Sequence, residues 1–178
     1  MPALYGEIGD DQMRELLRQA IEVLDMRREP GAPQIEVDLQ LPVLPPVLGI
    51  PSEVSHLFVT LLFNARDAMP AGGKIHVRAT HLANRVRVVV SDEGAGITAE
   101  HLPQLFQPFF TTKGAAGTGL GLWLAQSTMR RLGGSISARN GAAGGAEFVV
   151  EFRLAGDGEH VKRGRAPAPP RERTARRG

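Results

Sequence analysis

The sequence predicts an α/β two-layer sandwich in which helices cover one face of a single mixed, mostly antiparallel sheet. The first observation is the order of the expected elements: helix, strand, helix, two strands, helices, two strands. The second is the spacing of apolar residues, which recur every three or four positions in the expected helices and alternate in the expected strands. Hairpins mixed with helices in one chain are typical of this two-layer architecture.

The first two helices are expected at 11–26 and 52–69, where apolar residues recur at helical spacing. Asp10 or Asp11 is placed to cap the first helix, and Ser52 is placed to cap the second. The 52–69 segment has a broad apolar face, so one side of this helix is expected to pack on the core.

A third helix is expected over 122–132, where apolar residues again fall on one face and Gly133-Gly134 ends the pattern. A shorter helix is expected over 98–105, with Thr98 as its N-cap. The proline-rich segment 41–51 is expected to be an extended connector, because proline cannot donate to a sheet ladder.

Five strands are expected where apolar and polar residues alternate. They cover 34–41, 75–80, 85–90, 135–139 and 148–154, and a hairpin connection is expected over 81–84.

The chain has 178 residues, of which 42% are hydrophobic, and this suits one globular domain with its own core. We expect an N-terminal link over 1–10, a folded domain over 11–154 and a basic disordered tail over 155–178. The absence of cysteine excludes disulfides and thiolate metal sites. No apolar run approaches the ~18 residues of a membrane span and no signal peptide is visible, so a cytoplasmic protein without membrane contact by this segment is expected.

The charge of the chain is unevenly distributed. The segment from Ala155 onward has seven basic and three acidic residues, a net charge of +4, while the whole chain has +2, which leaves the preceding body near −2. A body of that charge does not support specific nucleic-acid binding. The basic tail is interpreted as a solvated end of the chain.

The segment 106–122, FQPFFTTKGAAGTGLGL, joins an aromatic anchor of Phe106, Phe109 and Phe110 to a Thr-Thr-Lys tip and a flexible glycine-rich stretch. Phe109 and Phe110 are expected to hold one end of the segment in place. Gly119 and Gly121 then open an apolar helical segment, and a helix start with unpaired N–H groups is a favourable seat for phosphate. Lys113 adds a mobile cation. The segment therefore suggests a lid over a nucleotide phosphate, with an ordinary glycine-rich surface loop as the alternative; it matches neither a Walker loop nor a dinucleotide-binding fingerprint.

Two polar residues stand out among apolar neighbours. Asn64 lies in the middle of the second expected helix, where its amide oxygen suits Mg²⁺, although a tolerated surface Asn is the plainer alternative. Asp92 ends an apolar strand and precedes glycines, so it is either a turn residue or an acceptor for an exocyclic amino group such as that of adenine.

Four segments in this order resemble the N, G1, F and G2 boxes of the ATP-binding catalytic domain of sensor histidine kinases. They are LLFNARDAM at 61–69, DEGAG at 92–96, LFQPFFTTK at 105–113 and GTGLGL at 117–122. This is the Bergerat-fold ATPase superfamily, which includes DNA gyrase, the Hsp90 chaperone and MutL. The PFFTTK sequence is most similar to nitrogen-regulation-type kinases, and the resemblance extends over about 13–154.

The resemblance implies a role for each matching residue. Asn64 would ligate Mg²⁺ that bridges the phosphates, and Asn64 and Lys113 would be the catalytic residues. Asp92 would accept a hydrogen bond from the adenine amino group. The ATP and Mg²⁺ cofactors would be bound by Asn64, Asp67, Ala68, Asp92, Gly94, Gly96, Ile97, Thr111, Thr112, Lys113, Gly117, Thr118, Gly119, Leu120, Gly121 and Leu122.

Several residues depart from the family pattern. Thr60 stands where many relatives have Asn and gyrase-like hydrolases have a Glu that activates water, so vigorous ATP hydrolysis is not expected. Asp67 stands where some kinases have a phosphate-contacting Lys, which leaves more of that charge to Lys113. Ala146-Glu147 replaces the usual Thr before the final strand, and one hydroxyl of the base pocket is lost.

The function implied by the resemblance is that of a protein histidine kinase catalytic domain in two-component signal transduction. No HExxHP-like segment precedes the domain in this sequence, so the phosphoacceptor is expected on a histidine-bearing dimerisation domain outside this chain, with a response regulator as the later partner. The alternatives are a stand-alone serine kinase of anti-sigma-factor type and a non-catalytic nucleotide-sensing adaptor.

Overall fold

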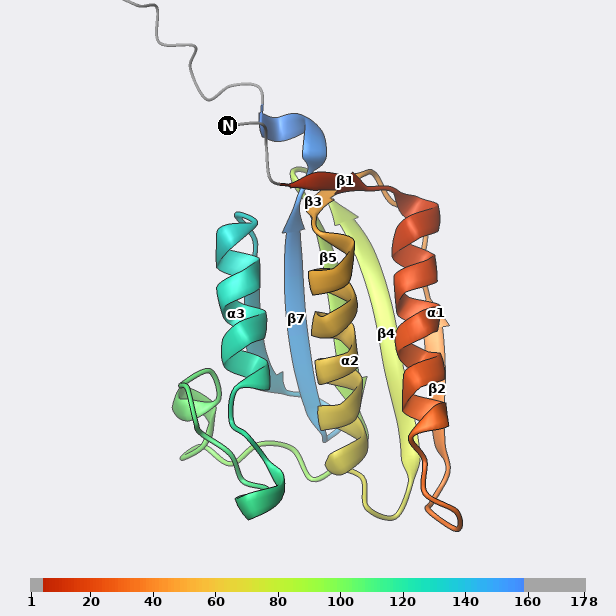
Figure 1. The fold of residues 1–178 in the computed structure, drawn as a ribbon, viewed down its shortest axis with the longest axis vertical. Helices are drawn as coiled ribbons and strands as arrows, with labels where there is room; N and C mark the ends of the chain where they lie inside the picture. The colour runs from red at the N-terminus through yellow and green to blue at the C-terminus, as the bar shows by residue number, and fades with distance from the viewer. Residues whose placement is uncertain (1–4, 159–178) are drawn as a thin grey trace, which may run out of the picture.

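A five-stranded sheet carries three helices on one of its faces in the computed structural model, which describes residues 5–158 (Figure 1). The order of the strands in the sheet is β2-β4-β5-β7-β6. In chain order the strands of this sheet are β2 (Ile35–Gln40), β4 (Gly73–Leu82), β5 (Arg85–Asp92), β6 (Ser135–Asn140) and β7 (Ala146–Arg153). The helices are α1 (Asp10–Met26), α2 (Pro51–Asp67) and α3 (Gly121–Arg131). The two-layer sandwich predicted from the sequence is confirmed.

The sheet is mixed, as expected. Strands β2 and β4 pair in parallel, with Ile35 opposite Gly73, whereas β4–β5, β5–β7 and β6–β7 are antiparallel. The connection between β4 and β5 is only the two residues Ala83 and Asn84, shorter than the expected hairpin loop over 81–84. A parallel pair needs a long crossover, and the chain between β2 and β4 includes α2.

The start of the chain and the proline-rich segment contain two short strands that the sequence did not predict. Strand β1 (Gly6–Ile8) pairs antiparallel with β3 (Val47–Gly49) in a separate two-stranded sheet. The side chain of Ile8 is 1% exposed, so part of the segment 1–10, predicted as a link, belongs to the folded core. The proline-rich segment still forms no strand of the main sheet.

The helix starts differ from the predicted caps. The N-cap of α1 is Gly9, and Asp10 instead accepts a hydrogen bond from the Leu44 backbone N–H at 3.0 Å and pairs with Arg14 at 2.9 Å. The N-cap of α2 is Ile50, and Pro51 occupies the first turn, where its missing N–H is not needed. Ser52 is therefore inside the helix.

The short helix expected over 98–105 is reduced to one 3₁₀ turn at Leu102–Gln104. The N-cap of this turn is His101, so the predicted N-cap at Thr98 is wrong, although Thr98 Oγ1 does accept a hydrogen bond from the His101 N–H at 3.3 Å. Pro103 has no N–H and disfavours an α-helix that would begin near Thr98.

The core lies between the helices and the sheet. Phe58 of α2 and Phe152 of β7 are both fully buried, and their ring centroids are 6.2 Å apart. Figure 1 shows α2 between α1 and α3, so this helix contacts both neighbours and the sheet. The packing of α2 between these neighbours sets where the residues of its last turn, Asn64 to Asp67, lie.

The described part of the chain ends with a 3₁₀ turn at Ala155–Gly158. The remainder of the segment predicted as a disordered tail, 159–178, lies outside the described residues. In the part that is described, no helix combines the length and apolar content needed to cross a bilayer.

We predict that Phe58→Ala lowers the free energy of unfolding by about 3–5 kcal/mol, because it leaves a cavity between α2 and β7. Urea denaturation measures this loss. Val43→Ala is the matched control, since Val43 is 83% exposed and its truncation leaves no cavity. Equal unfolding midpoints for the two variants would contradict the position of α2 in the core.

Candidate functional site

The sequence-predicted site residues come from three elements whose ends meet at one end of the sheet. Asn64 and Asp67 lie in the last turn of α2, Asp92 is the last residue of β5, and α3 begins at Gly121. The segment between β5 and α3 folds over this end of the molecule, toward the bottom of Figure 1. The predicted segments therefore lie at one site.

Asp92 is the buried carboxylate of the site, with 5% of the residue exposed. Its Oδ1 accepts hydrogen bonds from the backbone N–H of Gly94 at 2.9 Å and of Ala146 at 3.2 Å. Burial raises the pKa of Asp92, and the two backbone hydrogen bonds oppose that rise. Oδ2 takes part in neither of these bonds and remains able to accept one from a ligand.

Glycine is required on both sides of Asp92 because main chain approaches closely there. A Cβ at Gly94 would lie 2.4 Å from the Ala68 carbonyl oxygen and 2.8 Å from Asp92 Oδ1. A Cβ at Gly145 would lie 1.7 Å from the Asp92 carbonyl oxygen, and Gly145 also has a φ of +72°. The predicted residues Ala68, Asp92 and Gly94 are thus in direct contact.

The other side of the site is a cluster of charged and amide groups around Lys113. The ammonium of Lys113 donates to Asn64 Oδ1 at 3.2 Å and forms a short ion pair with Asp67 Oδ2. The Arg66 guanidinium donates to Asp67 Oδ1 at 2.9 Å and 2.7 Å. Burial opposes ionisation of Asp67, but the hydrogen bonds from Lys113 and Arg66 outweigh it, and the pKa of Asp67 is lowered.

In the lid segment (106–122), threonine hydroxyl groups accept hydrogen bonds from backbone N–H groups two residues further along the chain. Thr111 Oγ1 accepts from the Lys113 N–H at 3.1 Å, and a Cβ at Gly117 would lie 2.2 Å from that hydroxyl oxygen. Thr118 Oγ1 accepts from the Leu120 N–H at 3.4 Å. Of the remaining predicted lid residues, Thr112 is exposed and Leu122 packs partly buried against the core.

One crossing point in the lid depends on glycine. The Phe109 N–H donates to the Gly119 carbonyl at 2.9 Å, and a Cβ at Gly119 would lie 2.3 Å from the Phe109 carbonyl carbon. Gly119 has a φ of +67°, and Phe109 itself has a φ of +66°, which is unusual for a bulky residue. Phe109 is 75% exposed, so the aromatic anchor expected there is supplied by Phe106, which packs on the core.

The start of α3 lies beside α2. A Cβ at Gly121 would lie 3.0 Å from Thr60 Cγ2, so Thr60, which departs from the family pattern, faces the end of the lid. The resemblance noted in the sequence implies a base at this position in gyrase-like hydrolases, whereas Thr60 has only a methyl and a hydroxyl group. The structure therefore brings Thr60, Asn64 and Gly121 to the same side of α2.

Sequence reasoning missed Asn140, the last residue of β6. Its Oδ1 accepts from the Ile97 N–H at 2.7 Å, and its Nδ2 donates to the Ile97 carbonyl at 2.8 Å. Gly96, with φ +76°, lies against the same amide. An Asn that follows a strand is an ordinary turn residue in sequence, so no local pattern pointed to this contact.

The side-chain oxygens of Asn64 and Asp67 are donors of the kind that Mg²⁺ prefers. Asn64 Oδ1 and the Asp67 carboxylate are hard donors three residues apart on one helix, and both already hold the Lys113 cation. Within residues 5–158 no group of three or more His, Asp or Glu side chains is placed to hold a metal ion by itself. The donor set fits an ion that takes most of its ligands from phosphate and water.

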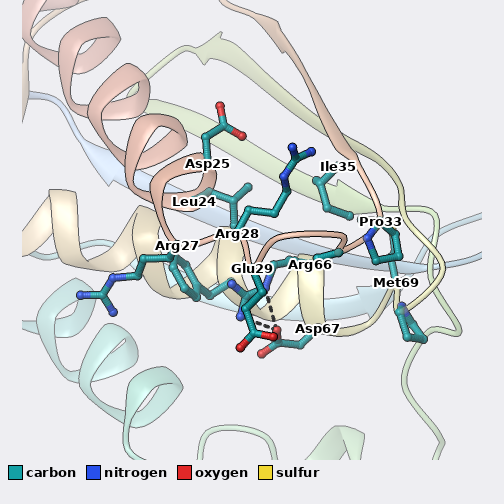
Figure 2. Close-up of a pocket in the computed structure, with 13 residues that line it drawn as sticks. Leu24, Asp25, Arg27, Arg28, Glu29, Pro33, Ile35, Arg66, Asp67 and Met69 are labelled. Atoms are coloured by element: carbon teal, nitrogen blue, oxygen red, sulfur yellow. Dashed lines mark hydrogen bonds and ion pairs between the residues drawn. The ribbon is translucent and has the colours of Figure 1, made fainter.

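A separate cavity of about 520 Å³ lies next to the site, between the C-terminal ends of α1 and α2 (Figure 2). Its wall includes Phe63, Arg66 and Asp67, and the guanidinium of Arg66 lies 4.3 Å from the Phe63 ring centroid. Asn64, Asp92 and Lys113 do not line it. It is therefore a neighbour of the site on the α1 side of α2.

Comparison with known proteins identifies the same architecture elsewhere. The family described as "Histidine kinase-, DNA gyrase B-, and HSP90-like ATPase" matches residues 49–156. The catalytic domain of histidine kinase ThkA superposes with a TM-score of 0.69 at 26% identity, over 84% of this chain and 97% of that one. Full-length ShkA in complex with AMPPNP superposes with a TM-score of 0.70 at 27% identity, over 87% of this chain and 32% of that one.

Similar curated proteins are sensor kinases. Sporulation kinase E of Bacillus subtilis is 30% identical over 142 residues, 79% of this chain and 19% of that protein. Two-component sensor PprA of Pseudomonas aeruginosa is 39% identical over 134 residues, 70% of this chain and 14% of that protein. The chain thus spans less than a quarter of the length of these relatives.

We predict that Asp92→Asn makes the domain more stable at neutral pH. Because the pKa of Asp92 is raised by folding, its neutral, protonated carboxyl contributes to the stability of the folded state. That contribution to the free energy of unfolding is fully present below pH 3.8 and is lost as the pH rises through the raised pKa of the folded protein. The Asn variant keeps an oxygen for the Gly94 and Ala146 N–H groups but buries no charge. Urea midpoints measured across pH should show an advantage at pH 7 that fades toward pH 3.8.

Glu100→Gln is the control for that comparison, because Glu100 is exposed and its removal changes the net charge equally. A destabilised Asp92→Asn variant at pH 7 would show that the carboxylate has a charged partner that the contacts above do not include.

Proposed function

This chain belongs to the family of histidine kinase-, DNA gyrase B-, and HSP90-like ATPases, and we propose that it binds Mg-ATP and delivers the γ-phosphoryl group to a histidine outside this chain. It is an ATP-binding catalytic domain of the histidine kinase type, homologous to two-component sensor kinases.

The observation that carries the proposal is the buried carboxylate of Asp92. Two backbone N–H groups hold Oδ1, while Oδ2 is free of both bonds and can accept from the exocyclic amino group of adenine. A buried carboxylate is costly unless it is hydrogen-bonded, and an amino group of a ligand would complete its bonding. Gly94 would form the backbone beside the base, since its main chain packs directly against the Ala68 carbonyl and Asp92 Oδ1.

On the phosphate side, Asn64 would hold Mg²⁺ through Oδ1, with Asp67 close by on the same helix face. The bound ion would supply positive charge that neutralises the phosphate oxygens. Lys113 already lies against Asn64 and Asp67, so its ammonium is placed to move from these oxygens to a phosphate group. It would then provide the charge that Asp67 cannot provide at a position where some relatives have lysine.

The lid would wrap the phosphates through its backbone. Gly117, Thr118, Gly119 and Leu120 lead directly into the first turn of α3 at Gly121, whose N–H groups have no intrahelical partner. The helix dipole adds favourable charge for an anion at this end. Thr111 and Thr112 would lie at the moving tip of the lid, with Lys113.

The reaction that suits this site is phosphoryl transfer to an imidazole nitrogen. The bond between the γ-phosphorus and the β–γ bridging oxygen breaks, ADP leaves with that oxygen, and a P–N bond forms. Catalysis would rest on positioning and charge neutralisation. Thr60 offers no base to activate water beside Asn64, which favours transfer over hydrolysis.

The partners would be those of a two-component kinase. The acceptor histidine would lie on a dimerisation domain, and a response regulator would take the phosphoryl group from it, in line with the two-component sensors among the relatives. The direct test incubates this chain with γ-³²P-labelled ATP, Mg²⁺ and candidate dimerisation domains. Acid-labile, base-stable label on the dimerisation domain is expected; label on serine, or none with any acceptor, would contradict the proposal.

We predict that Asn64→Ala removes most of the dependence of ATP affinity on Mg²⁺, since the amide oxygen is the proposed ligand. Calorimetric titration with ATP, in the presence of Mg²⁺ and in EDTA, measures the difference. Asn84→Ala, in the exposed β4–β5 turn, is the control and should behave as wild type. A normal Mg²⁺ effect in Asn64→Ala would remove the metal assignment.

We further predict that Lys113→Gln slows phosphoryl transfer about tenfold or more, because the transition state loses one charge-assisted contact. ATP affinity should change less than the rate. Arg18→Gln is the control, since Arg18 is an exposed residue of α1 that pairs with Glu15 of the same helix. An unchanged single-turnover rate in Lys113→Gln would exclude the lysine from the chemistry.

A further inference from the structure

The loop from Asp92 to Ile97 is held at both of its ends by one β-hairpin. At its first end, the Ala146 N–H donates to Asp92 Oδ1 at 3.2 Å. At its second end, the side-chain amide of Asn140 accepts from the Ile97 N–H at 2.7 Å and donates to the Ile97 carbonyl at 2.8 Å. The two residues that bind the loop lie opposite each other, since Asn140 is the register partner of Ala146 in the β6–β7 pair.

The amide of Asn140 pairs with Ile97 as the peptide of a neighbouring strand would. An Asn side chain has one carbonyl acceptor and two N–H donors, and here it uses one of each on the same residue. The two bonds hold the peptide groups on both sides of Ile97, whereas one bond would hold only one of them. The contact joins residues 43 positions apart in the chain.

The surrounding backbone leaves little room for another arrangement. A Cβ at Gly96 would lie 2.9 Å from Asn140 Oδ1, and Gly96 has a φ of +76°. Gly145, in the same hairpin, lies directly against the Asp92 carbonyl. The hairpin turn therefore contacts the loop along its length, and Asn140 is the point at which a side chain supplies the contact.

We propose that Asn140 is a positioning residue for the base pocket and holds the Gly94–Ile97 wall in place beside Asp92. This inference rests on the proposed function, in which that loop binds adenine. Asn140 would not touch the nucleotide, and it would act through the backbone of Ile97. We call the two hydrogen bonds between Asn140 and Ile97 the clamp. Loss of the clamp frees the Ile97 end of the loop, while the Ala146 N–H still holds Asp92.

The clamp has a consequence that a purely structural contact lacks. Asn140 is exposed, so water can hydrogen-bond to the groups that its truncation leaves without a partner. Truncation should therefore change the free energy of unfolding only slightly. The effect should appear in the order of the loop and in affinity for the base. Removal of both bonds is expected to weaken Mg-ATP binding about tenfold, the scale set by one or two net hydrogen bonds.

The experiment compares wild type with Asn140→Ala and Asn140→Asp. Amide hydrogen exchange without nucleotide should show the Ile97 N–H exchanging about tenfold faster in Asn140→Ala. Calorimetry should show the matching loss of Mg-ATP affinity, with a urea midpoint near that of wild type. Asn140→Asp keeps the acceptor for the Ile97 N–H but places a second oxygen against the Ile97 carbonyl, so its affinity should also fall below that of wild type.

Ser137→Ala is the matched control, because Ser137 is an exposed residue of the same strand. Unchanged Ile97 exchange in Asn140→Ala would overturn the clamp, and faster exchange with unchanged ATP affinity would overturn its role in binding. Asp92→Ala separates the two proposals. If Asp92→Ala also leaves ATP affinity intact, the proposed adenine site fails; if it abolishes binding while Asn140→Ala has no effect, only the inference on Asn140 fails.

Discussion

The site depends on the placement of one buried carboxylate where β5 ends. Asp92 is 5% exposed and is stabilised by the backbone N–H groups of Gly94 and Ala146. These donors come from the following loop and from the first residue of β7, so the carboxylate is fixed only when β5 and β7 pair in the observed register. Two further close contacts surround this group. Gly145 packs against the Asp92 carbonyl, and Gly94 packs against the carbonyl of Ala68, the C-cap of α2.

The proposed phosphate side of the site combines side chains on a packed helix with a cation on a loop. Asn64 and Asp67 lie on α2, whose inner face packs in the core, whereas Lys113 lies in a lid whose crossing point at Gly119 tolerates no side chain. A flexible cation is thus held by fixed oxygens through hydrogen bonds and an ion pair. This arrangement supports a nucleotide whose base is bound by a fixed pocket and whose phosphates are reached by a movable segment.

Most of the fold was predictable because it follows from apolar spacing: α2, the β4–β5 hairpin and the closing strand each show it clearly. Ser52 was wrongly expected as a cap because Pro51 could begin the helix one residue earlier, and the 98–105 helix was shortened by Pro103. Strands β1 and β3 are too short for alternation to be visible. The sequence motifs led to Asn64, Asp92 and Lys113, but Asn140 and the Ala146 N–H act through register, which the sequence of one strand does not contain.

Recognition of the adenine amino group by Asp92 can be measured by calorimetry of wild type and Asp92→Ala. The two ligands are Mg-ATP and the purine ribonucleoside triphosphate that lacks the exocyclic amino group. We expect wild type to bind ATP about tenfold or more tightly than this analogue, since a hydrogen bond to a charged group is lost, and Asp92→Ala to bind the two alike. Equal affinities in the wild-type protein would show that Asp92 does not recognise the amino group.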